Sequence, residues 1–146
     1  MKSAIERFGQ LARLTSRERR VLLHAWWLFL LVGLALRLLP ATRLLPRGPV
    51  TGTARPSLPL ERIGWLVRVA GRYAPRRATC LEEALVLARM LRGEGVDATV
   101  RFGVARDERG LRGHAWLECG GRVIFGSSEG DPYQALLPAA DAAPSR

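Results

Sequence analysis

A cysteine and a histidine are the two side chains in this sequence whose types and setting are suited to nucleophilic catalysis. Cys80 follows Thr79, and Glu82 stands three residues after that threonine, which is the spacing of a capping box at a helix start. Cys80 would then occupy the first helical position, among free backbone N–H groups and at the positive end of the helix dipole. Such a setting favours the thiolate, which is the nucleophilic form of cysteine.

His114 is the candidate general base. It lies in the strand-like run Gly113–Glu118, where His114, Trp116 and Glu118 would share one face because alternate strand residues point the same way. We therefore predict that Cys80 attacks a carbonyl carbon and that His114 accepts and returns the proton. The simpler alternatives are a cysteine that packs as a small hydrophobic side chain and a histidine at the rim of a sheet.

A general base of this kind needs a third group that orients its ring and fixes its tautomer. If Gly120 and Gly121 form a hairpin turn, His114 would lie opposite Ser127 on the next strand. The candidates for the third group are one hydroxyl and three carboxylates, those of Ser127, Glu129, Asp131 and Glu118. The candidate oxyanion donor is the backbone N–H of Cys80, since amides at a helix N-terminus can bind developing negative charge.

Hydrophobic periodicity predicts helices first and strands afterwards. Helices are expected over residues 1–14, 16–38, 60–74 and 80–91. Strands are expected over residues 96–104, 111–118 and 122–125. The prolines between residues 40 and 59 should exclude a helix there. The sequence therefore predicts an α+β fold in which the cysteine-bearing helix packs on a small antiparallel sheet.

The chain of 146 residues is short enough for one domain with an N-terminal helical appendage. We expect four segments, bounded by changes in periodicity and composition. They are an N-terminal helical region (1–45), a Pro/Gly/Arg-rich connector (46–59), a catalytic core (60–137) and a disordered tail (138–146).

One stretch of the second helix, Val21–Leu36, is uniformly apolar. It contains no Asp, Glu, Lys or Arg over 16 residues, fewer than the roughly 20 that a bilayer span needs, and arginines close both of its ends. We expect this helix to pack against the domain or to associate with a membrane surface rather than to span a membrane. His24, within it, is expected to be a packed residue and not a ligand.

The formal net charge of +10 comes almost entirely from arginine, because Lys2 is the only lysine. The arginines are spread along the chain, which favours a general arginine preference over a nucleic-acid site; a basic adaptor that binds nucleic acid or lipid is the non-enzymatic alternative. The two cysteines are too few for a disulfide scaffold and indicate a reducing, cytoplasmic setting. The cysteines and histidines do not have metal-ligand spacing, so no metal site is expected.

Four runs taken in order resemble one known family. They are Ala78–Leu85, Leu91–Ala98, Arg101–Val104 and Gly113–Glu118. Their order and spacing are similar to those of the lasso peptide biosynthesis B2 proteins, which belong to the transglutaminase-like, papain-related cysteine proteases. The resemblance covers roughly residues 15–126 and includes the arginine-flanked, leucine-rich helix before the connector.

This resemblance implies a cysteine peptidase that removes the leader from a ribosomally made lasso precursor peptide. A separate B1 protein would bind the leader, and an asparagine synthetase-like cyclase would then close the macrolactam ring. Cys80 would be the nucleophile and His114 the general base and acid, with no metal or organic cofactor. The family's third member is an acidic residue after the histidine, at the position where this sequence has Gly126. A transglutaminase-like acyl transferase, which passes the acyl group to an amine, is the alternative.

Overall fold

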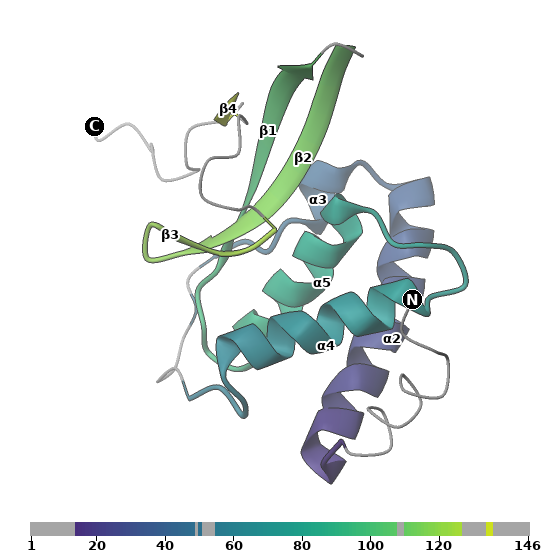
Figure 1. Ribbon diagram of the computed structural model, residues 1–146, viewed down its shortest axis with the longest axis vertical. Helices are drawn as coiled ribbons and strands as arrows, with labels where there is room; N and C mark the ends of the chain where they lie inside the picture. Colours follow the sequence, from purple (N-terminus) through teal and green to yellow (C-terminus); the bar gives the residue numbers. More distant parts are fainter. Residues whose placement is uncertain (1–13, 49, 51–54, 108–109, 127–133, 136–146) are drawn as a thin grey trace.

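The computed structural model describes residues 14–48, 50, 55–107, 110–126 and 134–135 (Figure 1). The helices are α2 (Ser16–Leu38), α3 (Ala41–Leu44), α4 (Leu60–Arg72) and α5 (Cys80–Gly93). The strands are β1 (Thr99–Asp107), β2 (Gly110–Cys119), β3 (Arg122–Phe125) and β4 (Gln134–Ala135). The predicted α+β fold is therefore confirmed, whereas residues 1–13 of the helix expected over 1–14 and the tail at 138–146 lie outside the described residues.

Helix α5 lies between the sheet and the other long helices (Figure 1). It contacts β1 and β2 on one side and α2 and α4 on the other. The five residues from Ala84 to Ala88 are at most 1% exposed, because neighbours cover the helix all around. The cysteine-bearing helix thus packs on the sheet, as the sequence predicted, and is the central element of the hydrophobic core.

Capping boxes are present at the starts of α2 and α5, and the one at α5 is the box that the sequence predicted. In α2 the Thr15 side chain accepts from the Glu18 N–H, and the Glu18 carboxylate accepts from the Thr15 N–H at 2.8 Å. Thr79 and Glu82 make the same two bonds at the start of α5. These bonds satisfy backbone donors that no helical carbonyl can reach, so they set the residue at which each helix begins.

The sheet has the strand order β3-β2-β1-β4, with all neighbours antiparallel. The meander from β1 to β3 was predicted, and the two-residue strand β4 on the outer edge of β1 was not. Pairing of β2 with β3 matches Glu118 to Val123, but an irregularity then shifts the register and matches Leu117 to Phe125. The expected pairing partners of residues before Glu118 therefore move by one position.

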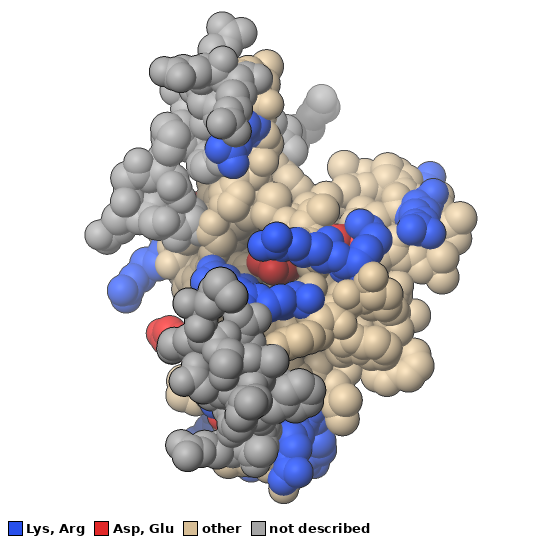
Figure 2. Space-filling view, turned by 45° about the vertical axis from the view of Figure 1, so that its right-hand side comes forward, with Lys and Arg blue, Asp and Glu red and all other residues tan. Residues whose placement is uncertain are grey.

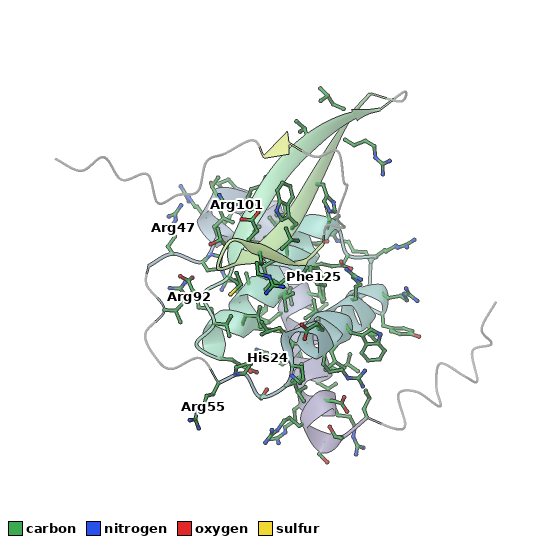
Figure 3. All side chains as sticks on the ribbon, turned by 60° about the vertical axis from the view of Figure 1, so that its left-hand side comes forward. His24, Arg47, Arg55, Arg92, Arg101 and Phe125 are labelled. Carbon is green, nitrogen blue, oxygen red and sulfur yellow. The ribbon has the colours of Figure 1, made fainter. Side chains whose placement is uncertain are left out.

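Helix α3 lies between Pro40 and Pro46, so the expectation that the prolines between residues 40 and 59 exclude a helix was wrong. Helix α3 starts directly after Pro40, whose φ of −65° and ψ of 145° suit a residue that precedes a helix. Five residues separate Pro40 from Pro46, and they are enough for one turn. Side chains of the helical body bind the connector: Arg92 donates to the carbonyl oxygens of Arg47 and Gly48 at 2.7 and 2.6 Å (Figure 3).

Helix α2 packs against the body along one face only. Val21, Ala25, Phe29 and Val32 are buried against α4 and α5, so α2 shares the core of the domain. His24 lies outside that face and is exposed, and the expectation of a packed histidine was wrong. The position falls on the outward side of the helix, which the uniformly apolar sequence did not distinguish from the inward side. The proposed domain boundaries stay a prediction.

Candidate active site

Cys80 is the first residue of α5, as the capping box predicted. Its thiol is free and partly buried, and the residue packs against the hydrophobic core. Its backbone N–H is one of the first-turn amides that have no partner inside the helix. Cys80 therefore combines a thiol with a positively polarised helix end, which is an arrangement that activates cysteine nucleophiles.

The capping box below Cys80 is itself held by an ion pair. Glu82 is only 3% exposed; one of its oxygens accepts from the Thr79 N–H at 2.8 Å, and the other accepts from the Arg76 guanidinium. A buried carboxylate with charged and backbone donors on both oxygens is costly to disturb, since removing either partner leaves an uncompensated charge. The start of α5, and with it the position of Cys80, is therefore rigidly defined.

A second carboxylate in the same helical turn has an altered acidity. Burial raises the pKa of Glu83, and the positive charges of Arg68, Arg77 and Arg72 oppose this rise without cancelling it. The Glu83 side chain lies beside Gly71 of α4, where a Cβ atom would come within 3.3 Å of a carboxylate oxygen. Glu83 thus packs between α5 and α4, with the arginines around it.

His114 lies in the middle of β2 and is partly buried. Its neighbour across the sheet is Gly103 of β1, which leaves room beside the imidazole. Its Nε2 donates a hydrogen bond to the carbonyl oxygen of Gly126. A carbonyl oxygen can only accept, so the Nε2 atom must carry the proton and the neutral ring keeps its lone pair on Nδ1. The ring orientation and its tautomer are therefore both fixed.

Gly126 can serve this role because it has no side chain. Its φ is +94°, and an added Cβ would lie 3.0 Å from the carbonyl oxygen of Ala115 and 3.1 Å from the Cα of Trp116. Phe125, just before it, is buried against Gly64 of α4 and holds the end of β3 on the helical body (Figure 3). The backbone of Gly126 thus approaches β2 closely enough for its carbonyl to reach His114.

Trp116 is the second residue that shapes the environment of His114. Its ring is stacked on the imidazole with a centroid distance of 6.4 Å and an interplanar angle of 22°, and the residue is 7% exposed. Trp116 Nε1 donates to Glu118 at 2.9 Å, and Arg101 donates to the other oxygen of Glu118 at 2.9 Å. A chain of contacts therefore runs from Arg101 through Glu118 and Trp116 to His114.

Each carboxylate oxygen of Glu118 accepts one of these two hydrogen bonds. Burial alone would raise the pKa of Glu118, but the hydrogen bonds from Trp116 and Arg101 and the charge of Arg101 outweigh burial and lower it. Glu118 is therefore ionised at neutral pH, and its hydrogen bond holds Trp116, the ring that is stacked on His114. Whether it also serves as the third catalytic member stays a prediction.

Of the other predicted site residues, Ser127, Glu129 and Asp131 lie outside the described residues. Cys119 ends β2 and is partly buried against the core, which agrees with a structural role. Helix α5 packs on β2, the strand that carries His114, so the two predicted catalytic residues lie on contacting elements. Their direct pairing stays a prediction. The sequence analysis did not predict that the carbonyl of Gly126 would bind His114. The signal that could have indicated it is that Gly126 stands where the similar family has its acidic residue.

A cavity of about 320 Å³ lies beside α5 on the side of the capping box that faces α2. Its lining includes Phe29, Leu34, Arg37, Arg76 and Glu82. Cys80 is not among the lining residues, and it projects from α5 roughly 160° around the helix from Glu82, since residues two apart differ by that angle. This cavity is therefore separate from the candidate active site.

Comparison with known proteins gave one match. The family model described as Transglutaminase-like superfamily matches residues 20–138, a span that includes α4, α5 and the whole sheet. No curated protein and no solved structure matched the chain. The matched span contains both Cys80 and His114.

Proposed function

The chain belongs to the transglutaminase-like superfamily, and from this premise we propose that it is a cysteine peptidase. Its substrate would be a ribosomally made lasso precursor, from which it removes the leader peptide before a cyclase forms the macrolactam. The superfamily includes both cysteine proteases and acyltransferases. The four sequence runs that resemble lasso B2 proteins are what favour the peptidase within this range.

The observation that carries the proposal is the hydrogen bond from His114 Nε2 to the Gly126 carbonyl oxygen. In the neutral ring this bond leaves Nδ1 as the basic atom. A backbone carbonyl thereby takes over the orienting role that an acidic side chain has in related enzymes. A thiol needs less help from such a group than a serine hydroxyl does, because cysteine ionises far more readily.

The proposed reaction begins with attack of the Cys80 thiolate on the carbonyl carbon of the last leader residue. The negative charge on the carbonyl oxygen is stabilised by the Cys80 N–H at the start of α5. The imidazolium of His114 donates its proton to the leaving amine, which releases the core peptide. Water, deprotonated by His114, then hydrolyses the thioester and releases the leader. The partner that delivers the leader would be the B1 protein, with the asparagine synthetase-like cyclase acting on the released core.

Mass spectrometry of a precursor peptide incubated with the protein and a leader-binding partner, in water enriched in ¹⁸O, tests this proposal. Hydrolysis predicts a single cut and one ¹⁸O atom in the new carboxylate of the leader. A leader joined to an added amine, without incorporation of ¹⁸O, would identify an acyl transferase instead. An unmodified precursor would contradict both activities.

A further inference from the structure

The outward face of α2 is apolar along most of its length. Five large side chains on this face are between 56% and 74% exposed, and we call them the outer stripe: Leu23, Trp27, Leu31, Leu34 and Leu38. Successive members are three or four residues apart, so they follow one line along the helix. Continuous apolar patches of this kind mark sites that bind another surface.

The inward face of the same helix is attached to the body at several levels. Near its start, Glu18 accepts from the Arg62 side chain at 2.6 Å. Further along, Trp26 Nε1 donates to the carbonyl oxygen of Tyr73 at 3.1 Å. Towards its end, Gly33 lies against the side chains of Glu82 and Arg76. By length and composition α2 could cross a membrane, but these contacts would then carry buried ion pairs into the hydrocarbon, where charges are costly.

On α2 itself, the exposed charged residues at both ends of the outer stripe are arginines. Exposed arginines lie at both of its ends: Arg19, Arg20, Arg37 and Arg43. The only acidic residue of α2 is Glu18, which is buried and paired with Arg62. Figure 2 turns the side of the molecule that carries α2 forward and shows a broad uncharged surface with blue groups around it and little red.

We propose that the outer stripe docks in the plane of an anionic lipid bilayer. The leucines and Trp27 would enter the boundary between headgroups and acyl chains, as apolar faces of interfacial helices do. The stripe from Leu23 to Leu38 is about 22 Å long at 1.5 Å per residue, and the arginines at its ends would contact lipid phosphates. The rest of the domain takes the place of the polar face that an isolated interfacial helix has.

A second copy of this chain suits the outer stripe less well. In an antiparallel pair of α2 helices Arg19 and Arg20 would face Arg37, and in a parallel pair each arginine would face itself. Neither arrangement supplies a carboxylate, and like charges in contact are repulsive. Protein interfaces also carry regular hydrogen bonds, whereas the leucines of the stripe offer no donor or acceptor. Acyl chains require none.

Flotation of the full chain with phosphatidylcholine vesicles, with and without a phosphatidylglycerol fraction, tests the proposal. We expect binding to the anionic vesicles, and release at high salt because the attraction between arginines and phosphates is screened. Leu31→Glu should weaken binding at least about tenfold, since it puts a charge where the bilayer would bury a leucine. The matched control is Leu111→Glu, which changes a leucine that is 68% exposed near the start of β2 and lies outside the outer stripe. This control should change binding by less than about twofold.

The arginines have their own test. Arg37→Gln should weaken binding about fivefold, the effect of one charge near an anionic surface. Arg122→Gln, which removes an exposed arginine from β3, should leave binding unchanged. Failure of the wild-type chain to bind anionic vesicles would overturn the proposal, and so would equal binding by the Leu31→Glu variant. A change from dimer to monomer caused by Leu31→Glu, measured by light scattering without lipid, would assign the stripe to a second copy.

This inference does not depend on catalysis. The Cys80→Ala variant should bind vesicles as the wild type does, whatever the outcome of the peptidase experiment. Vesicle binding without cleavage would support the docking surface and contradict the peptidase. Cleavage without vesicle binding would support the peptidase and contradict the docking surface. Resistance of the bound protein to extraction at alkaline pH would identify a spanning helix and contradict the in-plane arrangement.

Discussion

Replacing Gly126 by alanine removes the group that orients His114 while leaving every candidate catalytic side chain in place. The new Cβ would lie 3.0 Å from the Ala115 carbonyl oxygen, and the φ of +94° is unfavourable for alanine. Positive φ alone costs roughly 1–2 kcal/mol, and overpacking against β2 adds about 1–3 kcal/mol. The backbone at Gly126 must therefore shift, and its carbonyl should leave His114.

The effect on reactivity follows from the lost hydrogen bond. A bond from a charged imidazolium to a carbonyl is worth roughly 1.5–3 kcal/mol, which corresponds to a rate decrease of about 10- to 150-fold. The assay is the rate of Cys80 alkylation by iodoacetamide near neutral pH, with unfolding temperature measured in parallel. Gly121→Ala is the matched control, because its φ is +77° but nothing lies within 4 Å of the new Cβ. It should lose stability through φ alone and keep the alkylation rate.

A folded Gly126→Ala variant that reacts as fast as the wild type would refute this account of His114. Nitrogen NMR of the wild-type imidazole gives an independent measurement that does not require the variant to fold. We expect the neutral ring to carry its proton on Nε2, since the Gly126 carbonyl can only accept. A neutral ring protonated mainly on Nδ1 would contradict the hydrogen bond on which the assignment depends.

Three further predictions concern His114 and the helix that carries Cys80. His114→Ala should abolish Cys80 alkylation by iodoacetamide near neutral pH; unchanged alkylation would show that the histidine does not set the ionisation of the thiol. Thr79→Ala and Thr15→Ala should each cost about 1 kcal/mol of stability as lost helix caps, measured by urea unfolding, but only Thr79→Ala should slow alkylation of Cys80. Burial raises the pKa of Glu83 above its ordinary value of 4.5. The stability that the protonated Glu83 carboxyl contributes is therefore complete below pH 4.5 and is lost as the pH rises through the pKa in the folded protein. Glu83→Gln should flatten this fall in the free energy of unfolding above pH 4.5.

The parts of the fold that the sequence predicted are those set by local chemistry. Thr79 and Glu82 define the start of α5 through bonds within four residues, so the place of Cys80 could be inferred without any tertiary contact. The Gly120-Gly121 turn likewise sets the first pairs of β2 and β3, because both residues adopt positive φ. Hydrophobic periodicity predicted α4 and α5 for the same reason, because the repeat of apolar residues lies within one helix.

The parts that could not be predicted depend on contacts between distant residues. The Gly126 carbonyl that binds His114 is a backbone group, and no side-chain pattern reveals which carbonyl a fold will bring near a ring. The register shift after Glu118 moves the expected partners of β2, and a bulge leaves no clear mark in composition. The outward position of His24 and the exposure of the outer stripe were hidden because α2 is apolar on all sides.

The central claim is that Cys80 is the nucleophile of a peptidase, and the most direct test is cleavage of a lasso precursor by cysteine variants. The chain offers a matched pair, since Cys80 and Cys119 are both free and partly buried. With the leader-binding partner present, Cys119→Ala should release the leader at close to the wild-type rate, and Cys80→Ala should release none. Leader release by Cys80→Ala at the wild-type rate would contradict the claim.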